Sequence, residues 1–334
     1  IDDYRKLYDF VRQRLLPDRM NYIFLDEIQQ IKDFQRVVDA LYIKKNCDLY
    51  ITGSNAYLLS GELATLLSGR YVEIKMMPLS FKEYLSAFDE NRNAEQLYQN
   101  YIHNSSFPYV LELTEQKDIC QYLDGIYNSI IVKDIITRRR IGDVEMLKSV
   151  ARFLFDNIGN MTSAKKIADT MTSAGRKISV HTVESYLDAL TESFVFYRAG
   201  RFDIKGKQYL KTGDKFYAAD IGLRYHVLGT KKADIGHILE NIVYLELLRR
   251  GYEVYVGKVG SAEVDFIAIG AEGQEYYQVA YTVIDADGKT LERELTPLNA
   301  INDHNPKYLL TMDYGPMISH NGIRQLYVLD WLLK

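Results

Sequence analysis

Two adjacent carboxylates, Asp26 and Glu27, directly follow an apolar run at residues 22–25. A short run that is apolar throughout predicts a strand buried on both faces. Such a strand in a parallel sheet presents its last residues at the carboxyl edge, where ligands bind. There, one carboxylate can hold Mg²⁺ and the next can polarise a water molecule, which is the chemistry of nucleoside-triphosphate hydrolysis. The plainer alternative is a strand followed by a helix N-cap.

Further polar residues follow at intervals that suit the same chemistry. Residues 49–51 predict a second buried strand, and Ser54 and Asn55 come shortly after its end, where a polar side chain can sense a γ-phosphate. Arg70 can neutralise charge in a transition state, as arginine fingers do. These residues extend the candidate site beyond the two carboxylates.

The elements around these residues alternate between strand and helix. A helix is expected between the first two strands, and a third strand is expected over residues 71–76. Ser80 and Glu83 form a capping box that begins another helix. This order predicts an α/β fold whose parallel sheet is covered by helices.

The ordered series of Asp-Glu at 26–27, Thr-Gly-Ser-Asn at 52–55, Ser-Gly-Arg at 68–70 and Pro-Leu-Ser-Phe from residue 78 resembles a known family. The family comprises prokaryotic AAA-type ATPases with a C-terminal domain of unknown function, and the resemblance covers nearly the whole chain. It implies Walker B roles for Asp26 and Glu27, with Asp26 holding Mg²⁺ only together with ATP. It also implies a sensor role for Asn55 or Ser54, with Ser54 at the nucleotide, and a catalytic role for Arg70.

The phosphate loop of such an ATPase is absent from this sequence. The pattern GxxxxGK[ST] has no match, because Val283 stands where the first glycine should precede Gly288-Lys289-Thr290. We interpret the chain as an N-terminally truncated fragment, the alternative being a relative that naturally lacks the loop. ATP and Mg²⁺ are therefore expected as cofactors of the intact parent only, and neither is expected to bind this chain tightly.

Residues 146–230 predict a winged helix-turn-helix, with three helices followed by two strands around Gly206. Residues 151–217 carry eleven Lys and Arg against seven Asp and Glu, whereas the remainder is acidic. Basic charge on such a module favours contact with duplex DNA. An equally open alternative is a module that relays conformational change or binds protein. The candidate DNA contacts are Lys165, Arg176, Lys177, His181, Arg201, Lys205 and Lys207, with Arg198, Lys211 and Lys215 also assigned to the wing.

The last hundred residues predict one long helix and three closely spaced strands, the order of a restriction-endonuclease-like core. Glu240 and Asp265 match the acidic positions of that fold. Gln278 replaces the next acid, and Ala280 stands where the lysine should be. We therefore expect no nuclease activity and interpret this domain as a binding platform for a protein partner. Substitution by Glu246, Lys258 or Glu263, and a purely structural role for the acids, stay open.

Composition sets the remaining limits. The chain has 334 residues, 41 Lys and Arg against 45 Asp and Glu, and two cysteines. No apolar run could span a bilayer, so a cytoplasmic protein is expected. We expect four parts: an ATPase core fragment (1–89), a helical linker or lid (90–145), the winged helix (146–230) and the endonuclease-like domain (231–334). The function inferred is that of an ATP-dependent regulator, possible as an oligomer; the alternative is a non-enzymatic interaction module.

Overall fold

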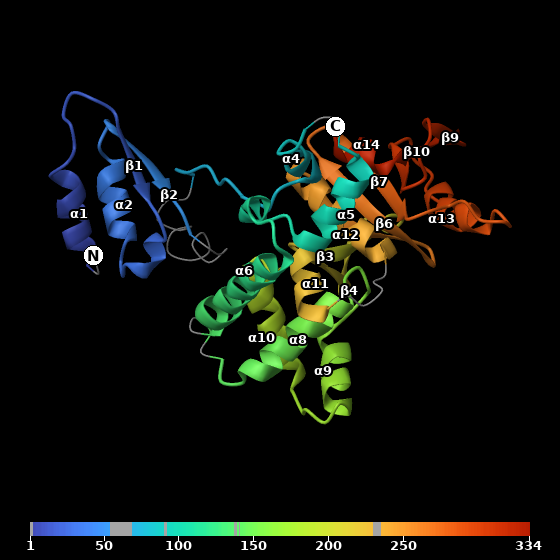
Figure 1. Cartoon of the computed structure of the whole chain (residues 1–334), viewed down its shortest axis with the longest axis horizontal. Coiled ribbons are helices and arrows are strands. Elements are labelled where there is room, and N and C mark those ends of the chain that lie inside the picture. The colour runs from blue at the N-terminus through green and yellow to red at the C-terminus, as the bar shows by residue number, and fades with distance from the viewer. Residues whose placement is uncertain (1–2, 54–68, 90–91, 137–138, 140, 230–234) are drawn as a thin grey trace. The chain divides into compact units, whose positions relative to one another are not determined.

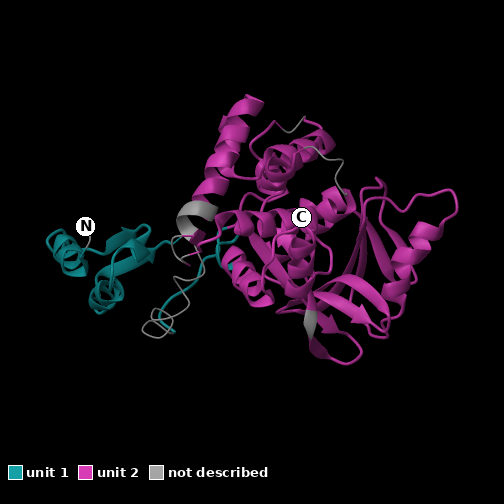
Figure 2. Cartoon of the chain, turned by 90° about the horizontal axis from the view of Figure 1, so that it is seen from below, with its two compact units in different colours: residues 1–76, 192–194 teal, residues 77–191, 195–334 magenta. Residues whose placement is uncertain are grey.

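The computed structural model describes all residues except 1–2, 54–68, 90–91, 137–138, 140 and 230–234. The chain forms two compact units, shown in different colours in Figure 2. Unit 1 comprises Ile1–Met76 with Glu192–Phe194, and unit 2 comprises Met77–Thr191 with Val195–Lys334. The expected α/β architecture is confirmed, whereas the four-part division of the chain stays a prediction.

Unit 1 is a small α/β layer in which two helices cover one face of a two-stranded parallel sheet (Figure 1). The strands are paired in register from Asn21 opposite Cys47 to Leu25 opposite Ile51, so their carboxyl ends meet. The core contains seven buried apolar side chains, mostly from the second helix and the turn before it. The elements are α1 (Tyr4–Arg12), β1 (Asn21–Leu25), η1 (Ile28–Gln30), α2 (Gln35–Tyr42) and β2 (Cys47–Ile51).

The expectation that these strands are buried on both faces is wrong. Tyr22 and Phe24 of β1 are 63% and 72% exposed, and Tyr50 of β2 is also exposed. Phe24 and Tyr50 stack on each other with ring centroids 4.7 Å apart. The physical reason is that only one face of this sheet has helices packed on it among the described residues, although parallel sheets are ordinarily covered on both.

The expected third strand over residues 71–76 is also wrong. These residues form no strand and are exposed, with Val72 at 89% and Met76 at 92%. A strand is defined by hydrogen bonds to a neighbour, so an alternating sequence alone does not form one. Among the described residues, no partner strand lies beside this segment.

Unit 2 begins with a helical segment whose capping box is confirmed. The Ser80 hydroxyl accepts a hydrogen bond from the Glu83 backbone N–H, and the Glu83 carboxylate accepts one from the Ser80 N–H. The apolar residues of this segment join the larger core of unit 2. The elements are α4 (Phe81–Leu85), α5 (Ala94–Asn104), η3 (Pro108–Glu112), α6 (Gln116–Asn128) and η4 (Ser129–Ile136).

Three helices and a hairpin follow. Side chains of Asp143, Ser163 and Ser179 cap the three helices by accepting hydrogen bonds from backbone N–H groups of their first turns. We call α8, α9 and α10 the three-helix group. The bounds are α8 (Val144–Asp156), α9 (Ala164–Ser173), α10 (Val180–Glu192), β3 (Phe196–Asp203) and β4 (Gln208–Ala218).

The hairpin β3–β4 is not a free wing, because β3 also pairs in parallel with β5. The result is one eight-stranded mixed sheet in the order β4-β3-β5-β6-β7-β8-β10-β9. Helix α12 packs against one face of this sheet, and α13 packs in the core on the other. The remaining elements are α11 (Ile221–Leu228), α12 (Ile235–Arg249), β5 (Glu253–Val259), β6 (Ala262–Gly270), β7 (Gly273–Ala280), α13 (Lys289–Asn299), β8 (Lys307–Thr311), β9 (Ile318–His320), β10 (Ile323–Tyr327) and α14 (Val328–Leu332).

Candidate functional site

The carboxyl edge of the unit 1 sheet brings together Asp26, Glu27 and Thr52. Asp26 and Glu27 follow β1, and Thr52 follows β2 at the same level, because Leu25 pairs with Ile51. The Thr52 hydroxyl donates a hydrogen bond to the Asp26 carboxylate. The same hydroxyl oxygen accepts one from the Glu27 backbone N–H at 3.1 Å. Thr52 therefore joins the two strand ends and fixes the direction of the first carboxylate.

The backbone and side chain of Glu27 are held as well. Its backbone adopts a left-handed conformation (φ 49°), which turns the chain sharply away from the strand. The Gln29 amide donates a hydrogen bond of 2.6 Å to the Glu27 carboxylate. Asp26 itself is exposed to solvent. Carboxylate and hydroxyl oxygens are hard ligands that suit Mg²⁺, so the donor set at this edge fits the metal of a bound nucleotide.

The other residues predicted for this site are placed less completely. Ser54 and Asn55 lie outside the described residues. Arg70 lies beside α2, where its guanidinium is 3.6 Å from the Asp39 carboxylate and 5.8 Å from the Tyr42 ring centroid. The structure thus gives Arg70 a surface ion pair, and its proposed contact with a nucleotide stays a prediction.

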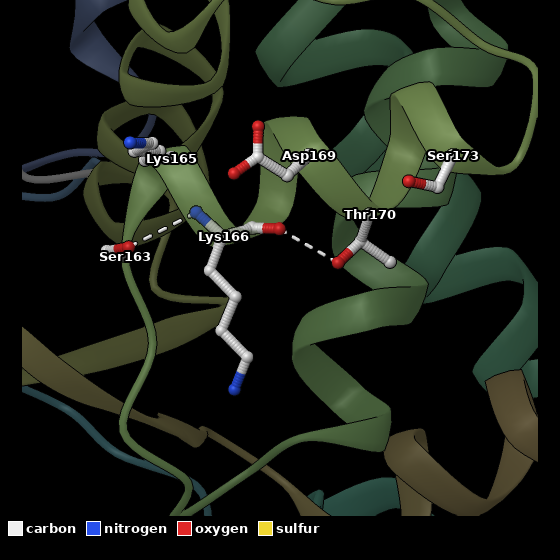
Figure 3. Close-up of a pocket in the computed structure, with 6 residues that line it drawn as sticks. All are labelled: Ser163, Lys165, Lys166, Asp169, Thr170 and Ser173. Carbon is white, nitrogen blue, oxygen red and sulfur yellow. Dashed lines mark hydrogen bonds between the residues drawn. The ribbon is translucent and has the colours of Figure 1, made fainter.

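Helix α9 carries a shallow hollow of about 540 Å³ on its exposed side, shown in Figure 3. Ser163 caps the helix, and Lys165 and Lys166 follow in its first turn. Thr170 donates a hydrogen bond to the Lys166 carbonyl, also drawn in Figure 3. Asp169 lies among these groups, so the hollow is polar and mixed in charge. The lining residues are Ser163, Lys165, Lys166, Asp169, Thr170 and Ser173.

Two further basic residues lie exposed at and just before the start of α10. Lys177 and His181 are exposed. Arg176 is engaged within the three-helix group instead, because it donates a 2.6 Å hydrogen bond to the Ser149 hydroxyl and lies 3.5 Å from the Asp143 carboxylate. Arg176 is therefore held in a structural contact that a DNA phosphate would have to replace.

The tip of the β3–β4 hairpin presents Lys205 and Lys207 to solvent. The Asp203 carboxylate accepts hydrogen bonds from the backbone N–H groups of Lys205 and Gly206, which fixes the turn. Arg201 is only partly exposed, and its side chain lies against Gly213. Of the three hairpin residues predicted to contact DNA, two lie at the exposed tip and Arg201 lies along β3.

A buried ionic cluster lies between β4, α12 and β6. Lys215 is only 4% exposed, and its ammonium lies 2.9 Å from Glu240 and 2.8 Å from Glu263. The Tyr217 hydroxyl donates a 2.6 Å hydrogen bond to the same Glu240 oxygen. Burial alone would lower the pKa of Lys215, but the charges of Glu240, Asp265 and Glu263 outweigh it and raise that pKa. Lys215 therefore stays charged.

Asp265 and Gln278 complete the set predicted from the endonuclease-like pattern. Asp265 accepts a 2.8 Å hydrogen bond from the Val279 backbone N–H. Burial, reinforced by the charge of Glu240, raises the pKa of Asp265 well above its ordinary value. The Gln278 amide donates to Glu294 at 2.9 Å. Within the part of the chain that the structure describes, no group of three or more His, Cys, Asp or Glu side chains is placed to hold a metal ion.

Two residues of these sites were not identified from the sequence. Thr52 stood directly after a predicted strand, and that position was the available signal. Lys215 was assigned to the wing, whereas the structure buries it. The apolar residues Phe216 and Tyr217 that follow it were the available sign that this part of the strand is buried. The cation beside Glu240 therefore comes from β4, a strand outside the predicted helix-and-three-strand pattern.

Comparison with family models matches two parts of the chain. Residues 1–85 match a model described as "AAA domain". Residues 95–234 match one described as "Domain of unknown function (DUF8612)". The first match contains Asp26, Glu27 and Thr52, and the second contains the three-helix group and the hairpin. None of the described helices is long and apolar enough to cross a membrane.

Relatives that match most of the chain occur in bacteria and archaea. Two archaeal relatives are the uncharacterized proteins MJ1544 and MJ1637 of Methanocaldococcus jannaschii, 30% identical over 293 residues and 27% identical over 290. The matches cover 82% and 74% of this chain but only 63% and 58% of those proteins. A solved structure of the Aeropyrum pernix ORC1 protein in complex with DNA aligns with a TM-score of 0.32 and 11% identity, over 74% of this chain and 69% of that one. A likeness at this level carries no argument about function.

An uncharacterized protein of Haemophilus influenzae is 45% identical over 332 residues, which is 96% of this chain and 81% of that protein. Identity at this level over nearly the full chain establishes common descent and a shared fold. The chain therefore belongs to the same protein family as this Haemophilus influenzae protein, with an AAA domain matched over its first 85 residues.

Proposed function

We propose that the protein is an AAA-type, ATP-dependent regulator, with its nucleotide chemistry at the carboxyl edge of the unit 1 sheet. The observation that carries the proposal is the joining of Asp26 and Glu27 to Thr52 across two parallel strand ends. That arrangement lies within the region matched by the AAA domain. Ligands of open parallel sheets bind at this edge, which supports the assignment.

The residues take distinct roles in this proposal. Asp26 would hold Mg²⁺, whose charge neutralises the phosphate oxygens when the nucleotide is bound. Thr52 orients Asp26, and Glu27 polarises the attacking water. Ser54 and Asn55 are proposed to sense the γ-phosphate, and the sequence supports this by their place shortly after β2.

Tight ATP binding also needs a phosphate loop, which these 334 residues do not contain. Isothermal titration of this chain with Mg-ATP is therefore expected to show no micromolar binding. A longer chain that carries a phosphate loop ahead of these residues should bind and hydrolyse ATP, and Glu27→Gln should then abolish hydrolysis while leaving binding in place. Hydrolysis that survives Glu27→Gln would contradict the proposed role of this edge.

A second proposed activity is contact with duplex DNA through a winged helix made of the three-helix group and the hairpin. The exposed side chains of Lys165, Lys177, His181, Lys205 and Lys207 support it. Each phosphate that such a lysine neutralises releases a counterion, so binding should weaken steeply with salt. A labelled duplex titrated at several salt concentrations tests this. Absence of binding at low salt would favour a module that relays conformational change or binds protein.

The C-terminal part is proposed to be a restriction-endonuclease-like fold without nuclease activity that serves as a platform for a protein partner. Lys215 supports this reading, because its ammonium already neutralises Glu240 and Glu263. Ala280 also offers no amine on the strand where catalysis would need one. DNA incubated with Mg²⁺ or Mn²⁺ should stay intact. Metal-dependent cleavage that Asp265→Asn abolishes would overturn this assignment.

A further inference from the structure

The end of strand β4, residues 214–218, is the point where three separate parts of unit 2 meet. It contacts helix α12, strand β6 and the loop between α8 and α9. Lys215 and Tyr217 make these contacts with side chains on one face of the strand, whereas Asp214 and Phe216 make them with backbone carbonyls. A displacement of one neighbour would therefore strain the contacts that this segment makes with the others.

Helix α12 is tied to β4 by side chains and backbone together. Glu240 accepts from both Lys215 and Tyr217, at 2.9 and 2.6 Å. The next residue of the helix, Asn241, makes two side-chain hydrogen bonds to the Ala218 backbone, accepting from its N–H at 2.7 Å and donating to its carbonyl at 2.9 Å. All five groups are buried, so their mutual orientation is well defined.

The three-helix group is tied to the same strand through its α8–α9 loop. The Gly159 N–H donates to the Phe216 carbonyl at 3.1 Å, and the Thr162 N–H donates to the Asp214 carbonyl at 2.9 Å. Gly159 has a φ of 70°, and a Cβ at this position would lie 3.3 Å from Glu240. The His237 ring would be nearer still, at 3.0 Å, so the loop lies close to α12 and its positive φ favours glycine at this position.

We call the contacts of residues 214–218 with α12, β6 and the α8–α9 loop the joint. Lys215 supplies the positive charge at its centre. Its ammonium is the cation in hydrogen-bond contact with Glu240, on α12, and with Glu263, on β6. Asp265 adds a third carboxyl group to the surroundings of that ammonium. Removing the ammonium would leave a buried carboxylate without a counter-charge, which is strongly unfavourable. Glu263 is partly exposed and can be solvated instead.

We propose that Lys215 is a positioning residue that fixes the three-helix group and the hairpin onto the C-terminal sheet as one rigid body. This part of the proposal rests on the proposed DNA contact: the joint fixes the spacing between the lysines in the first turn of α9, Lys177 before α10, and the hairpin tip at Lys205 and Lys207. Affinity for DNA is then set partly by a buried group that DNA does not touch.

The test uses the full chain and the double variant Lys215→Met/Glu240→Gln. This variant removes both buried charges, nearly preserves volume, and keeps an acceptor for the Tyr217 hydroxyl, so it is expected to fold. Lys215→Arg is the conservative control, since it retains the cation. Lys205→Met is the matched control for direct phosphate contact at the exposed tip.

Hydrogen exchange decides whether the joint exists. In the double variant, the amides of Gly159, Thr162 and Ala218 should exchange about tenfold faster than in the wild type, measured relative to amides of β8. A factor of about ten is typical of the coupling between neighbouring parts of a protein. The control Lys215→Arg should keep most of the wild-type protection of these amides against exchange. Unchanged protection, or faster exchange in equal proportion throughout unit 2, would overturn the proposal.

Titration with a labelled duplex tests the consequence for binding. The double variant should bind about fivefold more weakly with an unchanged salt slope, whereas Lys205→Met should reduce the slope by about 0.9. Loosened exchange with wild-type DNA affinity would overturn the positioning role. If the wild type itself does not bind DNA, the proposed function fails, and the exchange result still decides whether Lys215 forms the joint.

Discussion

Replacing Gly222 by alanine is expected to destabilise unit 2 strongly. Gly222 lies in the first turn of α11, and an added Cβ would be 2.3 Å from the Ser105 backbone nitrogen and 2.4 Å from its Cα. Ordinary van der Waals contact begins at 3.4 Å. Because the obstacle is backbone and not the end of a flexible side chain, α11 would have to move by about 1 Å in a densely packed interior.

That movement would disturb the buried cap of the same helix. The Asp220 carboxylate accepts hydrogen bonds from the Leu223 N–H at 2.6 Å, the Ser106 N–H at 2.7 Å and the Ser106 hydroxyl at 2.6 Å. Overpacking costs about 1–3 kcal/mol and each weakened hydrogen bond about 1 kcal/mol, so we expect a loss of roughly 3–5 kcal/mol in the free energy of unfolding. The midpoint of thermal unfolding should then fall by about 10 °C.

Gly125 provides the matched control. It lies inside helix α6, and a Cβ there would meet no atom within 4 Å. Gly125→Ala should therefore stabilise the chain by about 0.5–1 kcal/mol through helix propensity. Thermal and urea unfolding followed by circular dichroism would measure both variants. The reasoning is refuted if Gly222→Ala unfolds within a degree of the wild type, or if the two substitutions have the same effect.

Three further outcomes follow from the buried cluster and the hairpin. Burial and the charge of Glu240 raise the pKa of Asp265 in the folded chain, so the free energy of unfolding should fall as pH rises from the ordinary aspartate range toward that raised pKa. In a plot of the urea midpoint against pH, Asp265→Asn should flatten this decline. An unchanged slope in that variant would contradict the prediction. Lys215→Met alone should lower the free energy of unfolding, measured with urea, by about 3–5 kcal/mol, and adding Glu240→Gln should recover part of that loss. If the losses of the two single variants simply add in the double variant, Lys215 and Glu240 do not stabilise each other. Lys205→Met should leave the unfolding midpoint within about 0.5 kcal/mol of the wild type while weakening DNA binding, and a large loss of stability would show that the tip is not free.

Local sequence patterns predicted the strand ends well and the surroundings of the strands poorly. The position of Asp26 and Glu27 at a strand end could be predicted, because a short apolar run bounded by polar residues is a local signal. The same run cannot show whether both faces are covered, since cover comes from elements distant in the chain. Phe24 is exposed for that reason. Segment 71–76 illustrates the same point, since its alternation needs a partner strand to become a strand.

The ionic cluster was partly predicted for a related reason. Glu240 and Asp265 were placed by the spacing of a helix and three strands, which are close in sequence. Lys215 reaches them only because β3 pairs with β5 and carries β4 along, a pairing that no local pattern specifies. Side-chain periodicity therefore located the carboxylates, and tertiary pairing supplied their counter-charge.

The one tryptophan of the chain reports on only part of it. Trp331 is buried in the core of unit 2, where the Arg250 guanidinium lies 4.0 Å from its ring centroid and Tyr277 meets it edge-on. Unit 1 absorbs and emits through tyrosines alone. Fluorescence excited selectively at the indole would thus follow the unfolding of unit 2 and would not report on unit 1. The sheet that carries Asp26 and Glu27 could therefore unfold without any change in that signal.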